Sequence, residues 1–228
     1  MECWKLAPIV GEIIDKKASI LFELNNGKAI DVLKVEYSID NVGPRRKVDV
    51  EGNGCTKVII PFQNIGNYTI FWYIDEEIEY THNIYISNDA NEIIFVSCDL
   101  LEADTKHSLW SKIAANIPLN KKTIITHLGD QAYMDAVFNH CKKIVDMKLD
   151  DKETFELCFK AYGDRYCDIW RPHNALLGKT SNYYLWDDHE ITNDIQVDKI
   201  DDDVTKIISN SAIEAYNRYQ QSFHVNKT

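Results

Sequence analysis

The stretch TIITHLGD, residues 123–130, decides the fold that the sequence predicts. Most of its residues are apolar or β-branched and lack a polar face, as in a strand that is buried in a parallel sheet. Two comparable runs lie on either side of it along the chain, IIFVSC at 93–98 and NYYLWDDHE at 182–190. We therefore expect three strands of one parallel sheet, each ending in residues that can carry chemistry.

Segments with a helical pattern separate and follow these strands. They are HSLWSKIAANI at 107–117, AVFNHCKKIVDM at 136–147, KETFELCFKAYGDRY at 152–166 and KIISNSAIEAYNRYQQSF at 206–223. Strands that alternate with helices are typical of βαβ units and a parallel sheet. Residues 91–228 are thus predicted to form an α/β domain.

The first 88 residues follow a different pattern, with short runs rich in β-branched and aromatic residues between clusters of turn residues. The runs are ASILFEL at 18–24, VLKVEYSI at 32–39, KVIIPF at 57–62, NYTIFWYI at 67–74 and YTHNIYIS at 80–87. Short strands at this spacing favour an antiparallel sandwich. We predict an all-β, immunoglobulin-like domain at 1–88 and a linker at NDAN, residues 88–91.

The overall charge limits the classes of partner. The formal net charge is −11, so the surface should repel nucleic acid and anionic membranes. A phosphate ester would be repelled as well unless local metal ions reverse the field. The sequence has no apolar run of about 20 residues that could span a membrane and no secretory signal, so we expect a cytoplasmic protein.

Possible metal ligands follow all three strands of the predicted parallel sheet. They are Cys98 and Asp99 after the first strand, Asp130 and Tyr133 after the second, and Asp187, Asp188 and His189 after the third. Ligands bind beyond the carboxyl ends of strands in open α/β sheets. Each group alone has a plainer reading, as a turn, a solvated loop or, for the cysteine, a small buried hydrophobe. The three groups together, in order, are more specific.

This combination of residue types suits phosphate ester hydrolysis, one of the slowest reactions without a catalyst. Two metal ions about 3.5–4 Å apart can hold the ester and absorb the developing charge. Asp130 is the candidate bridge between them. A thiolate or phenolate favours Fe³⁺ at one position, while carboxylate oxygens also suit Ca²⁺ or other divalent ions. Gly129 would allow the sharp turn that brings the ligands close.

Three motifs make the chain resemble the PhoD-like alkaline phosphatase family of the calcineurin-like metallophosphoesterase superfamily. They are Ser97-Cys98, the HLGDQAY block at 127–133 and the WDDHE block at 186–190. Flanking segments are similar too, namely PIVGEI at 8–13, YGDRYCDIWRP at 162–172 and AYNRYQ at 215–220. The resemblance covers nearly the whole chain. It implies the N-terminal portion of a phosphomonoesterase or phosphodiesterase, with part of a four-layer core after the sandwich.

The resemblance also implies roles for individual residues. Cys98 and Tyr133 resemble ligands to a ferric ion, and Asp130 resembles the bridging carboxylate. Asp188 corresponds to the ligand of the second metal. His189 would hydrogen-bond the phosphate or stabilise the leaving oxygen.

Two further acidic residues, Asp99 and Asp187, could orient a ligand. The chain stops at Thr228, whereas the family continues into further histidine motifs and a second sheet, and His224, expected on a helix, is the one histidine after His189. Incomplete metal shells and a bare sheet face are therefore expected. The chain could be a fragment, a truncated inactive form, or one half completed by a partner chain.

Three functional hypotheses follow. The first is a metal-dependent phosphoric ester hydrolase, or the N-terminal part of one, and the second is a catalytically inactive homologue that acts as a binding protein. The third is an interaction module with an unrelated α/β part. The first requires the ligand side chains to converge, and the second requires folding without metal and no hydrolysis.

Overall fold

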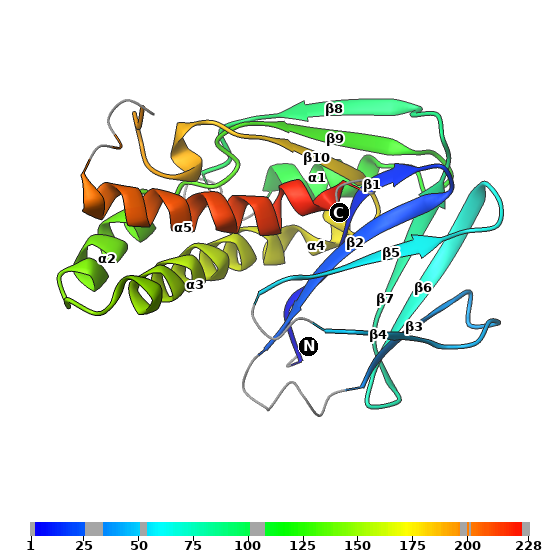
Figure 1. The fold of residues 1–228 in the computed structure, drawn as a ribbon. Helices are drawn as coiled ribbons and strands as arrows, with labels where there is room; N and C mark the ends of the chain where they lie inside the picture. The colour runs from blue at the N-terminus through cyan, green and yellow to red at the C-terminus, as the bar shows by residue number, and fades with distance from the viewer. Residues whose placement is uncertain are drawn as a thin grey trace.

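The computed structural model describes residues 3–25, 34–50, 54–100, 108–196, 200 and 202–224. Within these residues the chain forms two antiparallel sheets followed by a parallel sheet with helices on one side of it (Figure 1). This arrangement confirms the expected two-part organisation, β-rich first and α/β second. The immunoglobulin-like character of the first part stays a prediction.

The N-terminal part contains a three-stranded and a four-stranded antiparallel sheet. In spatial order the strands are β1 (Trp4–Ile14), β2 (Lys17–Leu24) and β5 (Thr56–Pro61), then β4 (Arg46–Val48), β3 (Val35–Ile39), β6 (Gly66–Ile74) and β7 (Glu77–Ile86). Trp72 lies at the centre of the core between them, fully buried, with the rings of Phe22, Tyr37 and Trp4 at 5.2, 5.8 and 6.4 Å from its own. Aromatic pairs at such distances stabilise a core beyond their buried area.

Strand β1 was not among the predicted strands. Nearly all of its residues are buried on both faces, so its sequence shows no alternation of polar and apolar residues. One face packs in the sandwich core, and the other side meets the α/β part, where Ser181 Oγ donates to the Gly11 carbonyl at 2.9 Å and Asn182 Nδ2 to the Val10 carbonyl at 2.6 Å. The strand therefore joins the two parts of the molecule.

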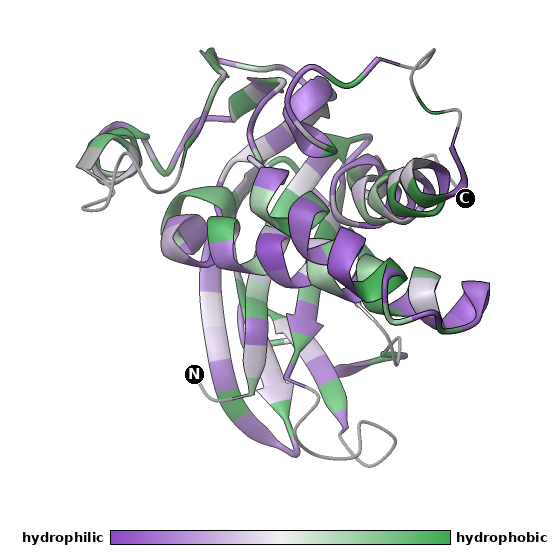
Figure 2. Ribbon diagram, turned by 90° about the vertical axis from the view of Figure 1, so that its left-hand side faces the viewer, coloured by the Kyte–Doolittle hydropathy of each residue, from purple (hydrophilic) through white to green (hydrophobic). Residues whose placement is uncertain are grey.

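The parallel sheet has the order β10-β9-β8, and its strands are interleaved with helices. The elements are β8 (Glu92–Val96), α1 (Ser108–Asn116), β9 (Thr123–Leu128), α2 (Asp135–Val145), α3 (Asp151–Trp170), η2 (Arg171–His173), α4 (Asn174–Leu177), β10 (Ser181–Leu185), η3 (Asp188–Glu190), α5 (Asp203–Tyr219) and η5 (Gln221–Phe223). The helices lie below the sheet in Figure 1, and Figure 2 shows hydrophobic and hydrophilic residues on the same helices. His224 follows η5 in extended backbone, so its predicted helical position was wrong.

The two faces of the parallel sheet differ. The inner face packs on helices, and Ile125 in β9 is fully buried there. On the outer face Ile93, Phe95, Leu128 and Leu185 are 55%, 64%, 43% and 55% exposed. Because residues that alternate along paired strands share a face, these side chains form one apolar surface that no described residue covers. The expected bare sheet face is therefore present.

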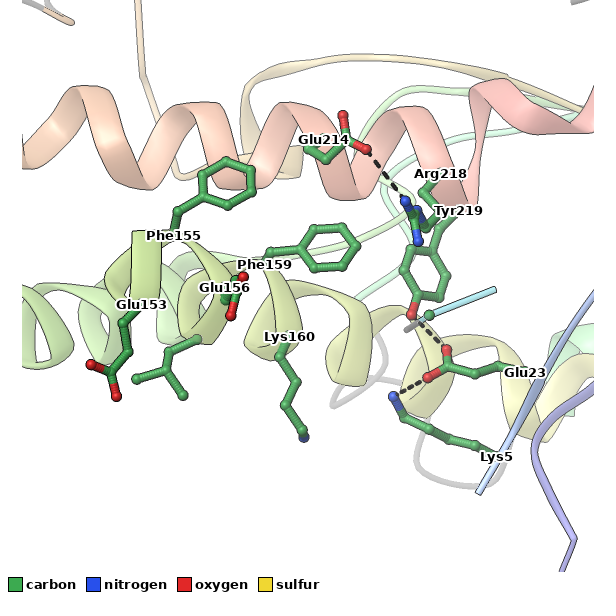
Figure 3. A pocket seen from close by; sticks show the side chains of 12 residues that line it. Lys5, Glu23, Glu153, Phe155, Glu156, Phe159, Lys160, Glu214, Arg218 and Tyr219 are labelled. Carbon is green, nitrogen blue, oxygen red and sulfur yellow. Dashed lines mark hydrogen bonds and ion pairs between the residues drawn. The ribbon is translucent and has the colours of Figure 1, made fainter. Parts of the chain in front are cut away.

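A second connection between the two parts is a buried carboxylate. Glu23, at the end of β2, is 3% exposed and accepts hydrogen bonds from Tyr219 Oη at 2.5 Å and Lys5 Nζ at 2.6 Å (Figure 3). The Cys167 thiol of α3 also donates to it, at 3.1 Å. Breaking such a buried network by removing one partner is strongly destabilising.

We expect the double variant Phe95→Lys, Leu185→Lys to bind less of the dye 8-anilinonaphthalene-1-sulfonate and to self-associate less than the wild type. Charges on the outer face would break up its exposed apolar surface, while the melting temperature should stay nearly unchanged because both side chains are exposed. Dye fluorescence, light scattering and calorimetry measure this. Val42→Lys is the control, since Val42 is 88% exposed outside this face. A large fall in melting temperature would show that the face is packed.

The buried His82 of β7 should make stability depend on pH. It is 8% exposed, and burial lowers its pKa from 6.5 to about 3. The unfolded chain then binds more protons, so stability falls as the pH drops below about 6.5 toward the folded pKa. When the pH falls from about 7 to about 5, the free energy of unfolding should decrease by about 2 kcal/mol less in His82→Phe than in the wild type. Urea unfolding at the two pH values measures this. His140→Gln is the control, because His140 is exposed and its loss should leave the pH dependence of stability as in the wild type. A wild-type pH dependence in His82→Phe would show that His82 does not cause it.

Candidate metal centre

Three possible metal ligands converge beyond the carboxyl ends of β9 and β10. One ligand atom each from Asp130, Asp188 and His189 lie within 4.8 Å of one another. The cause is the parallel pairing of the two strands, which sets Leu128 opposite Leu185, so that both chains leave the sheet at the same level. This is the edge at which ligands bind in open α/β sheets.

The turn after β9 holds Asp130 in an uncommon backbone conformation. Gly129 has a φ of 95° and Asp130 a φ of 55°, both in the left-handed region. A Cβ on Gly129 would lie 2.7 Å from the Cβ of Asp187, so the two ligand loops approach too closely for any larger residue there. Non-glycine residues held in this region cost energy and cluster at functional sites.

The carboxylate of Asp130 has an unused oxygen. Oδ1 is buried and has no hydrogen-bond partner among the described residues, while Oδ2 accepts from Cys98 Sγ at 3.5 Å. A buried carboxylate oxygen without a donor is costly unless a cation or water satisfies it. The residues present therefore fit a metal ion next to Asp130.

Cys98 borders this cluster and differs from the other five cysteines. It is exposed, whereas Cys3 is half-buried and the remaining four are buried; all six are free thiols. Its amide donates to the Gly129 carbonyl at 3.3 Å, and the amide of Asp99 donates to the Asp130 carbonyl at 2.9 Å. The end of β8 is thereby tied to the ligand turn of β9.

Tyr133 also borders the cluster, with its ring 4.2 Å from the ring of His189. Burial, followed by the negative charge of Asp130, raises the pKa of Tyr133 to about 12. The phenol thus stays protonated near neutral pH unless a cation is bound beside it, because a nearby positive charge favours the phenolate.

A short turn after β10 presents Asp188 and His189. Asp187 caps this turn by accepting from the Asp188 amide at 2.9 Å, and the Asp194 amide donates to the Asp188 carboxylate. His189 Nδ1 lies 2.9 Å from Asp135 Oδ2. Although burial lowers the pKa of His189, the hydrogen bond and charge of Asp135 outweigh it and raise the pKa.

The sequence did not single out two residues that support this arrangement. Asp135 was not distinguished from an ordinary residue at the start of a helix, yet it also accepts from the Asn193 amide at 2.8 Å and Thr192 Oγ1 at 3.1 Å. Glu190 belongs to the WDDHE block but received no role. It is fully buried, and burial raises its pKa to about 7.

The two residues proposed to orient ligands lie at the border. Asp99 Oδ2 is 3.8 Å from Nε2 of the buried His173, and Asp187 serves as the helix cap described above. Neither belongs to the group of three ligand atoms.

A separate groove lies between α3, α5 and the sandwich, with a volume of about 580 Å³. Figure 3 shows Phe155 and Phe159 along one wall and the network of Lys5, Glu23 and Tyr219 at one end. The groove shares no residue with the ligand cluster, so it does not contribute to that centre.

In comparisons with known proteins, no protein-family model matches the chain, and no curated protein matches its sequence. A solved structure titled "Structure of PhoD" superposes with a TM-score of 0.67 at 13% sequence identity, over 95% of this chain and 46% of that chain. The chain therefore has a PhoD-like fold and spans about half the length of that protein. No helix in the described part of the chain is both long and apolar enough to cross a membrane.

Replacing Gly129 by alanine should destabilise the protein by about 1–3 kcal/mol, because the new Cβ meets Asp187 and the left-handed backbone disfavours a side chain. Urea unfolding measures the change. Gly43→Ala is the matched control, since a Cβ there meets nothing within 4 Å. Equal stability of the two variants would contradict the close approach of the ligand loops.

Proposed function

We propose that this chain carries the N-terminal part of a metal-dependent phosphoric ester hydrolase, of the kind found in the PhoD-like alkaline phosphatases that its motifs resemble. The observation that carries the proposal is the convergence of Asp130, Asp188 and His189, with a free oxygen on Asp130, at the sheet edge of a PhoD-like fold. The fold alone would not establish an activity.

The donor set suggests how metal ions would be held. The carboxylates of Asp130 and Asp188 suit Ca²⁺ or another divalent ion, and the thiol of Cys98 and phenol of Tyr133 suit Fe³⁺. Asp130 lies beside both sets, which fits a bridging role. Bound ions would supply Lewis acidity and charge stabilisation for a phosphate ester.

His189 has the properties of a proton donor to the ester. Its Nδ1 is held by Asp135, which leaves Nε2 as the nitrogen that could face substrate. The hydrogen bond and charge of Asp135 raise the pKa of His189, which favours the protonated form of the ring. A protonated imidazole can hydrogen-bond a phosphate oxygen or stabilise the departing oxygen of the ester.

Further polypeptide should complete this centre. Asp130, Asp188, Cys98 and Tyr133 together provide fewer ligands than two metal ions normally receive from a protein. The PhoD structure extends well beyond the part that this chain matches, and no residue that the structure describes covers the outer sheet face. We propose that a C-terminal continuation of the same protein, or a partner chain, covers that face and adds ligands.

An inactive homologue that binds a partner or a phosphate ester is the second candidate. It is favoured by the small number of converging ligands in the described residues. It differs from the first candidate in predicting no turnover, even when metal is bound.

The test is metal analysis of the purified chain by mass spectrometry, with Mn²⁺ titration and hydrolysis of a chromogenic phosphate monoester and diester. We expect bound iron or calcium, and Asp130→Asn should weaken Mn²⁺ binding at least about tenfold, since losing a group that only orients a ligand already costs about 10–100-fold. Asp49→Asn, 98% exposed in the sandwich part, is the control.

The outcomes separate the two candidates. Turnover that is lost in Asp130→Asn supports the hydrolase. Metal binding without turnover favours the inactive homologue. A folded wild-type chain that binds no metal would overturn both the metal centre and the hydrolase.

A further inference from the structure

We infer that Glu190 is a positioning residue that holds the two ligand loops of the proposed metal centre in register; this inference rests on the proposed function. One carboxylate reaches both loops. Glu190 Oε2 accepts from the amides of Asp187 at 2.7 Å and Asp130 at 3.3 Å, and Oε1 accepts from the amide of Ala132 at 3.3 Å.

The loops lie beyond the hydrogen bonds of the sheet. The Met134 amide donates to the His189 carbonyl at 3.0 Å and so connects them further along, but Glu190 is the residue that holds the ligand turn at Asp130. The paired register of β9 and β10 ends at Leu128 and Leu185. Asp130 then enters the left-handed region, where regular secondary structure cannot fix its backbone. The carboxylate of Glu190 supplies acceptors to the amide of Asp130 itself, so it sets the direction in which this ligand points.

Only a carboxylate can serve all three amides. An ionised glutamate is acceptor-only, whereas a glutamine would turn an N–H₂ group toward one of the backbone donors. Glu190 is fully buried, and backbone amides are its hydrogen-bond donors within the described residues. Hydrogen bonds from three backbone amides favour the ionised form of a carboxylate, and all three of these amides belong to the ligand loops.

The charge of Glu190, like its position, would favour metal binding. When Glu190 is ionised, its negative charge lies next to that of Asp130, and the charge of Asp130 is one of the causes that raise the pKa of Glu190. Crowded negative charges favour a cation between them. Position and charge therefore have to be separated by experiment.

Two substitutions make this separation. Glu190→Gln keeps the shape and removes the charge and one acceptor, while Glu190→Asp keeps the charge but is shorter by one methylene and cannot reach both loops. Glu23→Gln is the matched control, because Glu23 is also a buried carboxylate but lies in the junction with the sandwich. It should lower the melting temperature and leave metal binding unchanged.

The measurements are Mn²⁺ affinity, followed by electron paramagnetic resonance, and amide hydrogen exchange of Asp130, Ala132 and Asp187 in the metal-free chain. In both Glu190 variants we expect Mn²⁺ affinity to fall about 10–100-fold, as is typical when a group that orients a ligand is lost. The three amides should exchange about tenfold faster or more, since each loses or weakens a charge-assisted hydrogen bond.

Each outcome decides a specific point. Wild-type affinity and exchange in both variants would overturn the role of Glu190 while leaving the metal centre intact. Weakened binding in Glu190→Gln alone would assign the effect to charge and overturn positioning. If the wild type binds no Mn²⁺, the proposed function fails, and amide exchange alone then decides whether Glu190 orders the loops. If Glu190→Gln does not fold, Glu190→Asp carries the test.

Discussion

The candidate site depends on the parallel pairing of β9 with β10. Because the two strands run in the same direction with Leu128 opposite Leu185, the residues after them emerge side by side. Asp130 and the Asp188-His189 pair therefore emerge next to each other, and contacts between their loops hold them there. A register shift of one residue would turn every side chain of a strand to the other face and separate the ligands. Gly129 adds a local requirement, because the two loops approach so closely there that a residue with a Cβ would not fit.

Much of this arrangement was accessible from the sequence. Continuous apolar runs followed by ionisable residues predicted the three parallel strands and the residues at their ends. Strand β1 escaped detection because it is buried on both faces and has no alternating pattern, and β4 is only three residues long. Asp135 and Glu190 escaped as well, because their roles arise from hydrogen bonds across 54 to 60 residues of sequence rather than from spacing within a motif.

Both the candidate site and the whole molecule carry an excess of negative charge. Asp130, Asp135, Asp188 and Glu190 gather at one sheet edge in a chain whose formal net charge is −11. Such a site repels a phosphate ester when it holds no cation. Bound cations would reverse the local field, so under the proposed function metal binding and substrate binding would be linked through charge as well as through coordination.

Strand β1 has a consequence for how the chain folds. Its contacts join residues that lie about 170 positions apart, as in the bonds of Gly11 with Ser181 and Val10 with Asn182. Glu23 and Tyr219 are 196 positions apart. Contacts between such distant residues form late and slow the search for the native topology. Until the segment around β10 has been synthesised, one side of β1 lacks its partner, so the first strand of the nascent sandwich is fully enclosed only after about 170 further residues have followed it.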